Sequence, residues 1–223
     1  MYDYTEKRRS IRDLMEYAVP EGWMEEAEDL LDIYRNDAIA LELLHEFYSY
    51  LPEAGSDWVR EIRLIGRRQG MFLLAAVTPV NSYVYLVSSE GIEFQGILAE
   101  GLWDRDILDF FGYGSRDTFR EQSRSAERFG IYEPLDSDRD ICPGCHAATG
   151  ELHELGCPVE LCPWCGGQLV YCSCRYDQLG AESLSSEEDI IRFEEILDRR
   201  GRIPYSPEQR PAYPDEGPGV LIE

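Results

Sequence analysis

Residues 142–174 read CPGCHAATGELHELGCPVELCPWCGGQLVYCSC, and the rest of the chain is best interpreted from this stretch. It holds all seven cysteines and two of the three histidines of the 223-residue chain. The motif Cys-Pro-x-Cys occurs twice. In such a knuckle, backbone N–H groups turn toward thiolate sulfurs, which is typical of metal binding. Eight donors follow one another in four close pairs: Cys142 and Cys145, His153 and Cys157, Cys162 and Cys165, and Cys172 and Cys174.

Eight sulfur and nitrogen donors are what two closed tetrahedral zinc sites need, so the sequence predicts two structural Zn²⁺ ions. Two pairings of the donors are open. In the sequential scheme, residues 142–157 hold one ion and residues 162–174 hold the other. In the ribbon scheme the two knuckles share one ion, and the remaining donors hold the second. We favour the sequential scheme because its smaller loops lose less chain entropy on closure.

The sequential scheme also makes local predictions. His153 and Cys157 are four residues apart, so they would lie on one face of a helical turn that ends at Gly156. Residues 166–167, both glycine, would turn a hairpin toward Cys172.

Other uses of the cysteines fit the sequence less well. The cysteine count is odd and no apolar signal stretch follows Met1, so we expect a cytoplasmic protein without a disulfide framework. An iron–sulfur cluster could use thiolates alone, but a histidine at ligand spacing favours zinc. A catalytic zinc keeps an open coordination position, and eight donors for two ions leave none. We expect His146 to lie beside the site or at the surface.

The residues before the cysteines predict an α+β domain. Three segments carry apolar residues at helical spacing, and four β-prone segments with short connections follow. Connections of hairpin length predict an antiparallel meander packed against the N-terminal helices. The second of these strand segments, 71–77, is apolar on both faces, which predicts a central position in the sheet. The helical segments are 5–18, 23–34 and 37–51, and the strand segments are 59–67, 71–77, 83–88 and 92–95.

Further elements complete the predicted architecture. Short helices are expected at 107–111 and 115–128, and a polar linker at 130–140. A capping-box-like start at Ser186 predicts a helix that runs to Arg200. The predicted domains are an α+β domain over 1–135, a zinc module over 140–175, an associated helix over 176–203 and a proline-rich extended tail over 204–223.

Charge excludes some functions. The net charge is −23, from 21 basic and 44 acidic residues. Binding to phosphate backbones needs clustered Lys and Arg, and none lies between Arg139 and Arg175, so we expect no direct nucleic-acid binding. No run approaches eighteen apolar residues, so we expect no membrane span.

The cysteine-rich stretch resembles a zinc-ribbon-like module that occurs at or near the ends of many uncharacterised bacterial proteins. Residues 197–205 also look like a helix end that accompanies such modules. The resemblance covers about residues 140–205 and implies a bacterial zinc-binding module with no established activity. We recognise no family for residues 1–135. The matching residues are Cys142, Cys145, Gly150, His153, Gly156, Cys157, Glu160, Cys162, Cys165, Gln168, Leu169, Cys172 and Cys174.

Three functions are compatible with these features. We favour an acidic, zinc-stabilised interaction protein, for example an immunity or regulatory protein that binds a basic protein partner through electrostatic steering. A second hypothesis is a nucleic-acid mimic that inhibits a DNA-processing enzyme, which would need rows of carboxylates at phosphate spacing. A third is an enzyme with a carboxylate site in residues 1–135, although the sequence has no Walker loop or His-Glu-x-x-His motif.

Metal removal tests the predicted module. Chelation of zinc, or the substitution Cys162→Ser, should unfold the chain from about residue 140 onward and leave the N-terminal domain folded, because the metal-binding energy is local folding energy. Hydrogen exchange measured by mass spectrometry, with and without chelator, would locate the change. Full protection of residues after 140 in the metal-free protein would contradict the prediction.

Overall fold

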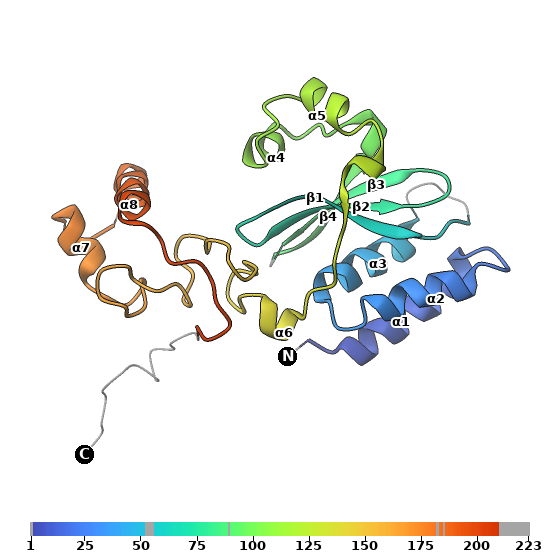
Figure 1. Cartoon of the computed structure of the whole chain (residues 1–223), viewed down its shortest axis with the longest axis horizontal. Helices are drawn as coiled ribbons and strands as arrows, with labels where there is room; N and C mark the ends of the chain where they lie inside the picture. Colours follow the sequence, from blue (N-terminus) through green and yellow to red (C-terminus); the bar gives the residue numbers. More distant parts are fainter. Residues whose placement is uncertain (1, 52–55, 89, 182, 185, 210–223) are drawn as a thin grey trace, which may run out of the picture. The chain divides into compact units, whose positions relative to one another are not determined.

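The computed structural model describes residues 2–51, 56–88, 90–181, 183–184 and 186–209 (Figure 1). The chain forms two compact units, Met1–Ser137 and Asp138–Glu223, here called unit 1 and unit 2. Helices precede an antiparallel sheet, the cysteines follow, and a helix lies near the end, so the predicted α+β fold class is confirmed. The part of the predicted tail after Gln209 lies outside the described residues. No described helix is long and apolar enough to cross a membrane.

Three helices open unit 1: α1 (Tyr4–Ala18), α2 (Met24–Ile33) and α3 (Ala38–Tyr50). Side-chain caps fix where α1 and α3 begin. Asp3 accepts hydrogen bonds from two backbone N–H groups of the first turn of α1, and Asp37 accepts one from the first turn of α3. The caps supply acceptors to N–H groups that have no partner inside a helix.

A five-stranded sheet follows in the order β4-β3-β2-β1-β5. Every pairing is antiparallel, and β2 lies at the centre as its apolar sequence predicts. The short strand β5 was not predicted, because residues 130–131 were assigned to a linker. These two residues pair with Arg63 and Leu64 of β1, a long-range contact that local sequence does not reveal. The strands are β1 (Glu61–Arg68), β2 (Met71–Val77), β3 (Ser82–Ser88), β4 (Gly91–Ile97) and β5 (Gly130–Ile131).

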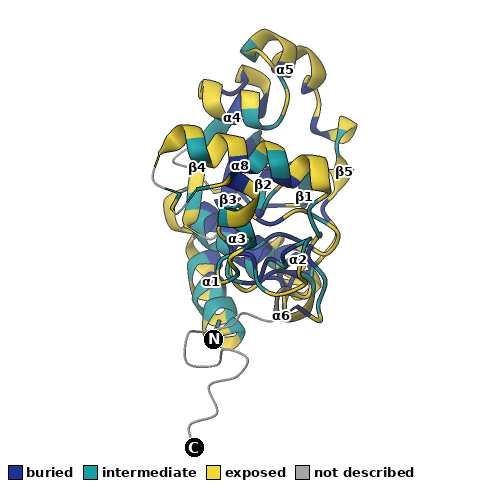
Figure 2. Ribbon diagram, turned by 90° about the vertical axis from the view of Figure 1, so that its left-hand side faces the viewer, coloured by how far each residue is buried: buried dark blue, intermediate teal, exposed yellow. Residues whose placement is uncertain are grey.

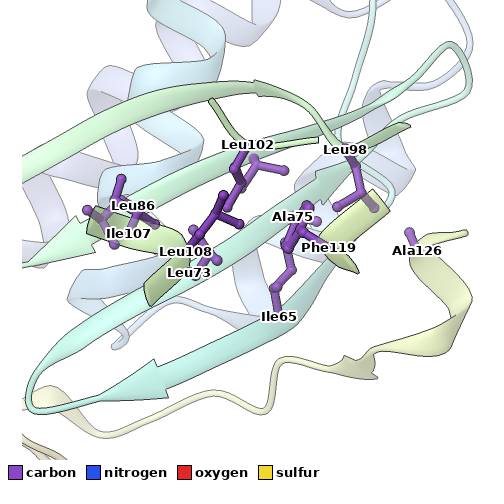
Figure 3. Close-up of a cluster of buried hydrophobic side chains, with 11 residues drawn as sticks. Ile65, Leu73, Ala75, Leu86, Leu98, Leu102, Ile107, Leu108, Phe119 and Ala126 are labelled. Carbon is purple, nitrogen blue, oxygen red and sulfur yellow. The ribbon is translucent and has the colours of Figure 1, made fainter. Parts of the chain in front are cut away.

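Both faces of the sheet are covered, with α1 to α3 on one side and α4 and α5 on the other (Figure 1). Side chains alternate between the faces along a strand. Thus Phe47 of α3 contacts Tyr83 of β3, with ring centroids 5.8 Å apart. On the opposite face, Leu73 and Leu86 join a cluster with Leu108 of α4 (Figure 3). A strand buried on both faces explains why β2 is apolar throughout.

The predicted helix at 115–128 is wrong in its extent. It is divided into α5 (Arg116–Gln122) and the short 3-10 helix η2 (Ala126–Arg128). The Ser125 side chain accepts a hydrogen bond from the backbone N–H of Glu127 and so caps η2. Serine side chains compete with helical backbone bonds in this way. The other short elements of unit 1 and its boundary are η1 (Leu98–Glu100), α4 (Arg105–Phe110) and α6 (Ser137–Asp140).

Two helices, α7 and α8, follow the cysteine-rich loops in the described part of unit 2. The helix α8 (Glu187–Arg200) has the predicted bounds, and the Ser186 hydroxyl accepts the N–H of Asp189 at 3.1 Å. Acidic residues occupy its first turn and Arg199 and Arg200 its last, which matches the helix dipole. The helix α7 (Cys174–Leu179) was not predicted as a separate helix, because residues 176–203 were assigned to one associated helix.

The bond between Tyr34 and Tyr132 offers a test of unit 1. The Tyr34 hydroxyl donates to the Tyr132 carbonyl at 2.6 Å, and both residues are buried. Tyr34→Phe keeps the ring but leaves that carbonyl without this donor, so it should lower the free energy of unfolding by about 1–3 kcal/mol. Tyr17→Phe is the control, because Tyr17 is 86% exposed. Urea unfolding followed by circular dichroism measures both, and equal stability of the two variants would contradict the expectation.

Candidate metal centres

The structure brings the eight predicted donors into two groups of four. Within each group the ligand atoms all lie within 4.8 Å of one another. The grouping follows the sequential scheme, and the two knuckles contribute to different groups. The first group is Cys142, Cys145, His153 and Cys157, and the second is Cys162, Cys165, Cys172 and Cys174.

The two knuckles repeat the same backbone structure at an offset of 20 residues. Each contains an isolated antiparallel bridge, Ile141 with Ala148 and Leu161 with Gln168. The residue after the second cysteine has a left-handed backbone in both, at φ +58° and +75°. Four backbone hydrogen bonds of the first knuckle recur in the second. Those of the first are Cys142 N to Ala147 O, His146 N to Cys142 O, Thr149 N to Asp140 O and Glu151 N to Ala148 O. Their counterparts in the second are Cys162 N to Gly167 O, Gly166 N to Cys162 O, Leu169 N to Glu160 O and Tyr171 N to Gln168 O.

The first group has the dimensions of a tetrahedral site. The Sγ atoms of Cys142 and Cys157 are 3.6 Å apart, and Cys145 Sγ lies 3.4 Å from His153 Nδ1. Four ligands at the usual zinc distances would place two sulfurs about 3.8 Å apart and a sulfur and a nitrogen about 3.5 Å apart. Gly144 donates its N–H to Cys142 Sγ at 3.4 Å, and a Cβ there would lie 3.1 Å from Cys157 Sγ. Glycine therefore lets the backbone approach the sulfurs.

All four donors of this group are buried, and the burial affects their protonation. Hydrogen bonds with Cys142 and Cys157 lower the pKa of the Cys145 thiol. Burial disfavours the charged form of His153, but hydrogen bonds with Cys142, Cys145 and Gln209 outweigh it and raise its pKa to about 10. The group thus favours a thiolate, and a bound metal ion would replace the protons that the other donors carry.

The segment after α8 packs against the first group. His153 Nε2 lies 2.9 Å from Gln209 Oε1. Gln209 also donates from Nε2 to the Pro204 carbonyl at 3.0 Å, which orients its oxygen toward the imidazole. His153 Nε2 then carries the proton and Nδ1 is the ligand atom. The Tyr205 ring packs edge-on against His153 with centroids 5.6 Å apart.

A buried ion pair fixes the same segment. Arg202 contacts both carboxylate oxygens of Glu160, at 2.8 and 3.0 Å, and donates to the His153 carbonyl at 2.7 Å. The two charged side chains are only 4% and 1% exposed. Burial raises the pKa of Glu160, and the bonds to Arg202 oppose that shift. Because breaking a buried pair leaves one uncompensated charge, the pair holds Arg202 at the ligand loop.

The predicted helical turn from His153 to Cys157 is wrong. The segment forms an ordinary turn, in which the Cys157 N–H bonds to the Glu154 carbonyl at 3.1 Å. Gly156 adopts φ +93°, a conformation that suits glycine. The His153 carbonyl, which a helix would have used internally, accepts from Arg202 instead. His146 is half-buried and belongs to neither group of donors.

The second group is more exposed. Cys162 is buried, Cys172 and Cys174 are half-buried, and Cys165 is exposed. A cluster of apolar residues from α7 and α8 backs it, and the Trp164 ring stacks on Phe193 at 6.4 Å. Cys174 is also the first residue of α7, so a ligand begins the helix that the sequence prediction missed.

Comparisons of the chain with protein-family models, curated proteins and solved structures found no match. The chemistry of the sites therefore rests on their donors. Thiolates with an imidazole suit zinc and other soft or borderline metals, and four protein ligands complete a tetrahedral shell. Two such groups can hold two metal ions with a structural role.

Two polar groups of unit 1 are of the kind that a carboxylate or serine enzyme uses, and both contact other parts of unit 1. Asp37 is buried, which raises its pKa, and it accepts N–H groups of Ala40 and Leu135. Ser10 Oγ lies 3.2 Å from His45 Nε2 and joins α1 to α3. Sequence reasoning missed this contact, because the two residues are 35 positions apart.

The contact with Gln209 predicts a specific effect on metal binding. Gln209→Ala removes the acceptor that orients His153, so it should weaken binding of one zinc equivalent by about 10–100-fold and leave the second equivalent unchanged. Competition with a chromophoric chelator measures both equivalents. Gln122→Ala, at an exposed position of unit 1, is the matched control. If Gln209→Ala bound both zinc equivalents as tightly as the wild type does, the expected result would be contradicted.

Proposed function

We propose that this chain is a zinc-stabilised interaction protein, whose unit 2 is folded by two structural zinc ions and binds a basic protein partner. The donor sets support zinc, because closed shells of thiolates and one imidazole are typical of structural zinc sites. Structural zinc allows a short segment with a small apolar core to fold. That arrangement leaves side chains of unit 2 free to form a surface for another molecule.

An apolar groove on unit 2 is the observation that carries this proposal. It has a volume of about 290 Å³ and is lined by residues 155–156 and 169–170, by α7, by Leu184 and by α8. Arg175 also lines it, but its guanidinium group bonds to the carbonyls of Leu169 and Val170 and to the Tyr176 hydroxyl. Its carbon chain thus adds to the apolar lining. The apolar lining residues are Leu155, Leu169, Val170, Leu184, Ile190 and Phe193.

Exposed apolar residues extend from the groove along α8. Ile190 and Ile191 are 44% and 51% exposed, and Figure 2 draws much of the α8 ribbon in the colour of exposed residues. Contiguous exposed apolar residues are typical of protein interaction sites. Such a surface accommodates the apolar face of a partner helix or an extended apolar segment.

The charge of α8 supports the choice of partner. Its first turn carries Glu187, Glu188 and Asp189 directly before Ile190, and the chain as a whole has a net charge of −23. A basic partner would be attracted over a distance and then bind through apolar contacts. The bacterial setting implied by the resemblance suits an immunity or regulatory protein that neutralises a basic effector.

The groove can be tested with a single substitution. Tagged protein isolated from its native host should retain a basic partner, and Ile190→Ser should weaken binding of that purified partner by about tenfold or more, because it removes an apolar contact from the centre of the surface. Titration calorimetry at two salt concentrations measures the affinity. Ile33→Ser, at a residue of unit 1 that is 57% exposed, is the control.

Two outcomes would contradict the proposal. One is a partner that binds equally well to Ile190→Ser and to wild type. The other is loss of the partner on addition of duplex DNA to the complex at physiological salt, which would favour the nucleic-acid mimic instead. Metal content is measured on each variant first, so that loss of zinc is not mistaken for loss of the groove.

A further inference from the structure

A polar cavity in unit 1 is separate from the metal centres and from the groove. Its volume is about 540 Å³, within the range of small-molecule sites. It lies where β1 begins, β2 ends and η2 approaches the sheet. Leu98 and Ala126, which line the cavity, also belong to the apolar cluster of the sheet and are labelled in Figure 3.

Three arginines line this cavity in a chain that has 44 acidic and 21 basic residues. Arg63 is held in place, because it binds Glu61 at 2.8 and 3.0 Å and donates to the Phe129 carbonyl at 2.7 Å. The side chains of Arg60 and Arg124 have neither a hydrogen bond nor an ion pair within the described part of the chain. Two guanidinium groups therefore line the cavity with their donors available.

The buried hydroxyl of Ser123 lies in the wall of this cavity. Ser123 lines the cavity and is 1% exposed, and its Oγ has no hydrogen-bond partner among the described residues. A buried hydroxyl without a partner costs about 1–3 kcal/mol, so such groups are normally satisfied. Ser82 and Ser125 add two more hydroxyl groups to the lining.

The local charge is opposite in sign to that of the chain. Glu61 and Glu127 are the acidic residues of the lining, and Glu61 is paired with Arg63. Arg60 and Arg124 thus outnumber the one remaining carboxylate. The field of a chain with net charge −23 repels anions, so an anion would bind only where arginines are gathered.

We propose that this cavity binds a small organic dianion. Its negative charge is carried either by a phosphate monoester or by two carboxylates. Arg60 and Arg124 supply charge-assisted hydrogen bonds to the oxygens of the ligand. Ser82 and Ser125 contribute neutral hydrogen bonds from their hydroxyl groups. Arg63 is a positioning residue, because its bonds to Glu61 and the Phe129 carbonyl fix the cavity wall.

Calorimetric titration of the zinc-loaded full chain tests this site. The probes are glycerol 3-phosphate, succinate and uncharged glycerol. One of the two dianions should bind at one equivalent with a Kd of about 1 mM or tighter, and glycerol should not bind. Binding of the phosphate ester or of succinate identifies the source of the charge. Absence of saturable binding for both dianions up to about 10 mM would overturn the proposal.

Matched variants place the binding in the cavity. Arg60→Gln and Arg124→Gln should each weaken the bound dianion by about tenfold or more, because each removes hydrogen bonds from a charged donor. Arg105→Gln removes the same charge from α4 at a side chain that is 86% exposed and does not line the cavity. Equal weakening by Arg105→Gln would show that the binding is not local and would overturn the assignment.

Ser82→Ala adds a readout that does not depend on charge. It removes a hydroxyl group of the lining and leaves every arginine in place, so the dianion should bind more weakly. Unchanged affinity in this variant, with Arg60→Gln also unchanged, would contradict the site. The titration does not involve a partner protein, so its failure is distinguishable from failure of the proposed function.

Discussion

The gathering of thiolates and one imidazole into two groups of four is the constraint on which unit 2 depends. Residues 141–173 form turns, bends and two isolated bridges, and they contain neither a helix nor a strand. The backbone of such a segment makes few regular hydrogen bonds, so fixing it costs conformational entropy that packing alone must offset. Apolar packing here is confined to small clusters that include the cysteines themselves. Ligand bonds to a metal ion in each group of four would supply the missing energy.

The two knuckles share one backbone design, yet their surroundings differ. The first is enclosed by the segment after α8, through Gln209, Tyr205 and the buried pair of Arg202 with Glu160. The second is backed by α8 itself through Phe193. The first site therefore depends on the segment after α8, and the second depends on α8 itself.

The sequence predicted the features that follow from periodicity and spacing. The three N-terminal helices, the meander with a central β2 and the bounds of α8 each rest on local patterns of apolar residues and caps. The donor residues were found because cysteines in close pairs are rare outside such sites. The pairing of the donors required loop entropy as well, and the structure groups them in that way.

What the sequence did not predict depends on contacts between distant residues. Strand β5 exists because Gly130 and Ile131 meet β1, and the helical turn at His153 is absent because Arg202, 49 positions away, takes its carbonyl. The role of Gln209 is likewise invisible locally, since a glutamine between prolines suggests an extended tail. The sequence signal for this region was the resemblance of residues 197–205 to a helix end that accompanies such zinc modules. Arg60 and Arg124 line one cavity but are far apart in the sequence, so local patterns could not predict that they meet.

The proposed zinc ions would also alter the electrostatics of unit 2. Zinc with four thiolates carries a formal charge of about −2, and with three thiolates and a neutral imidazole about −1. Metal binding therefore adds negative charge to a segment that has no Lys or Arg between Arg139 and Arg175. The more exposed second site, at Cys165, places part of this charge at the surface, and its neighbour Leu169 lines the apolar groove. In the proposed function, the same ions that fold unit 2 would strengthen its attraction for a basic partner, so folding and recognition would depend on one event.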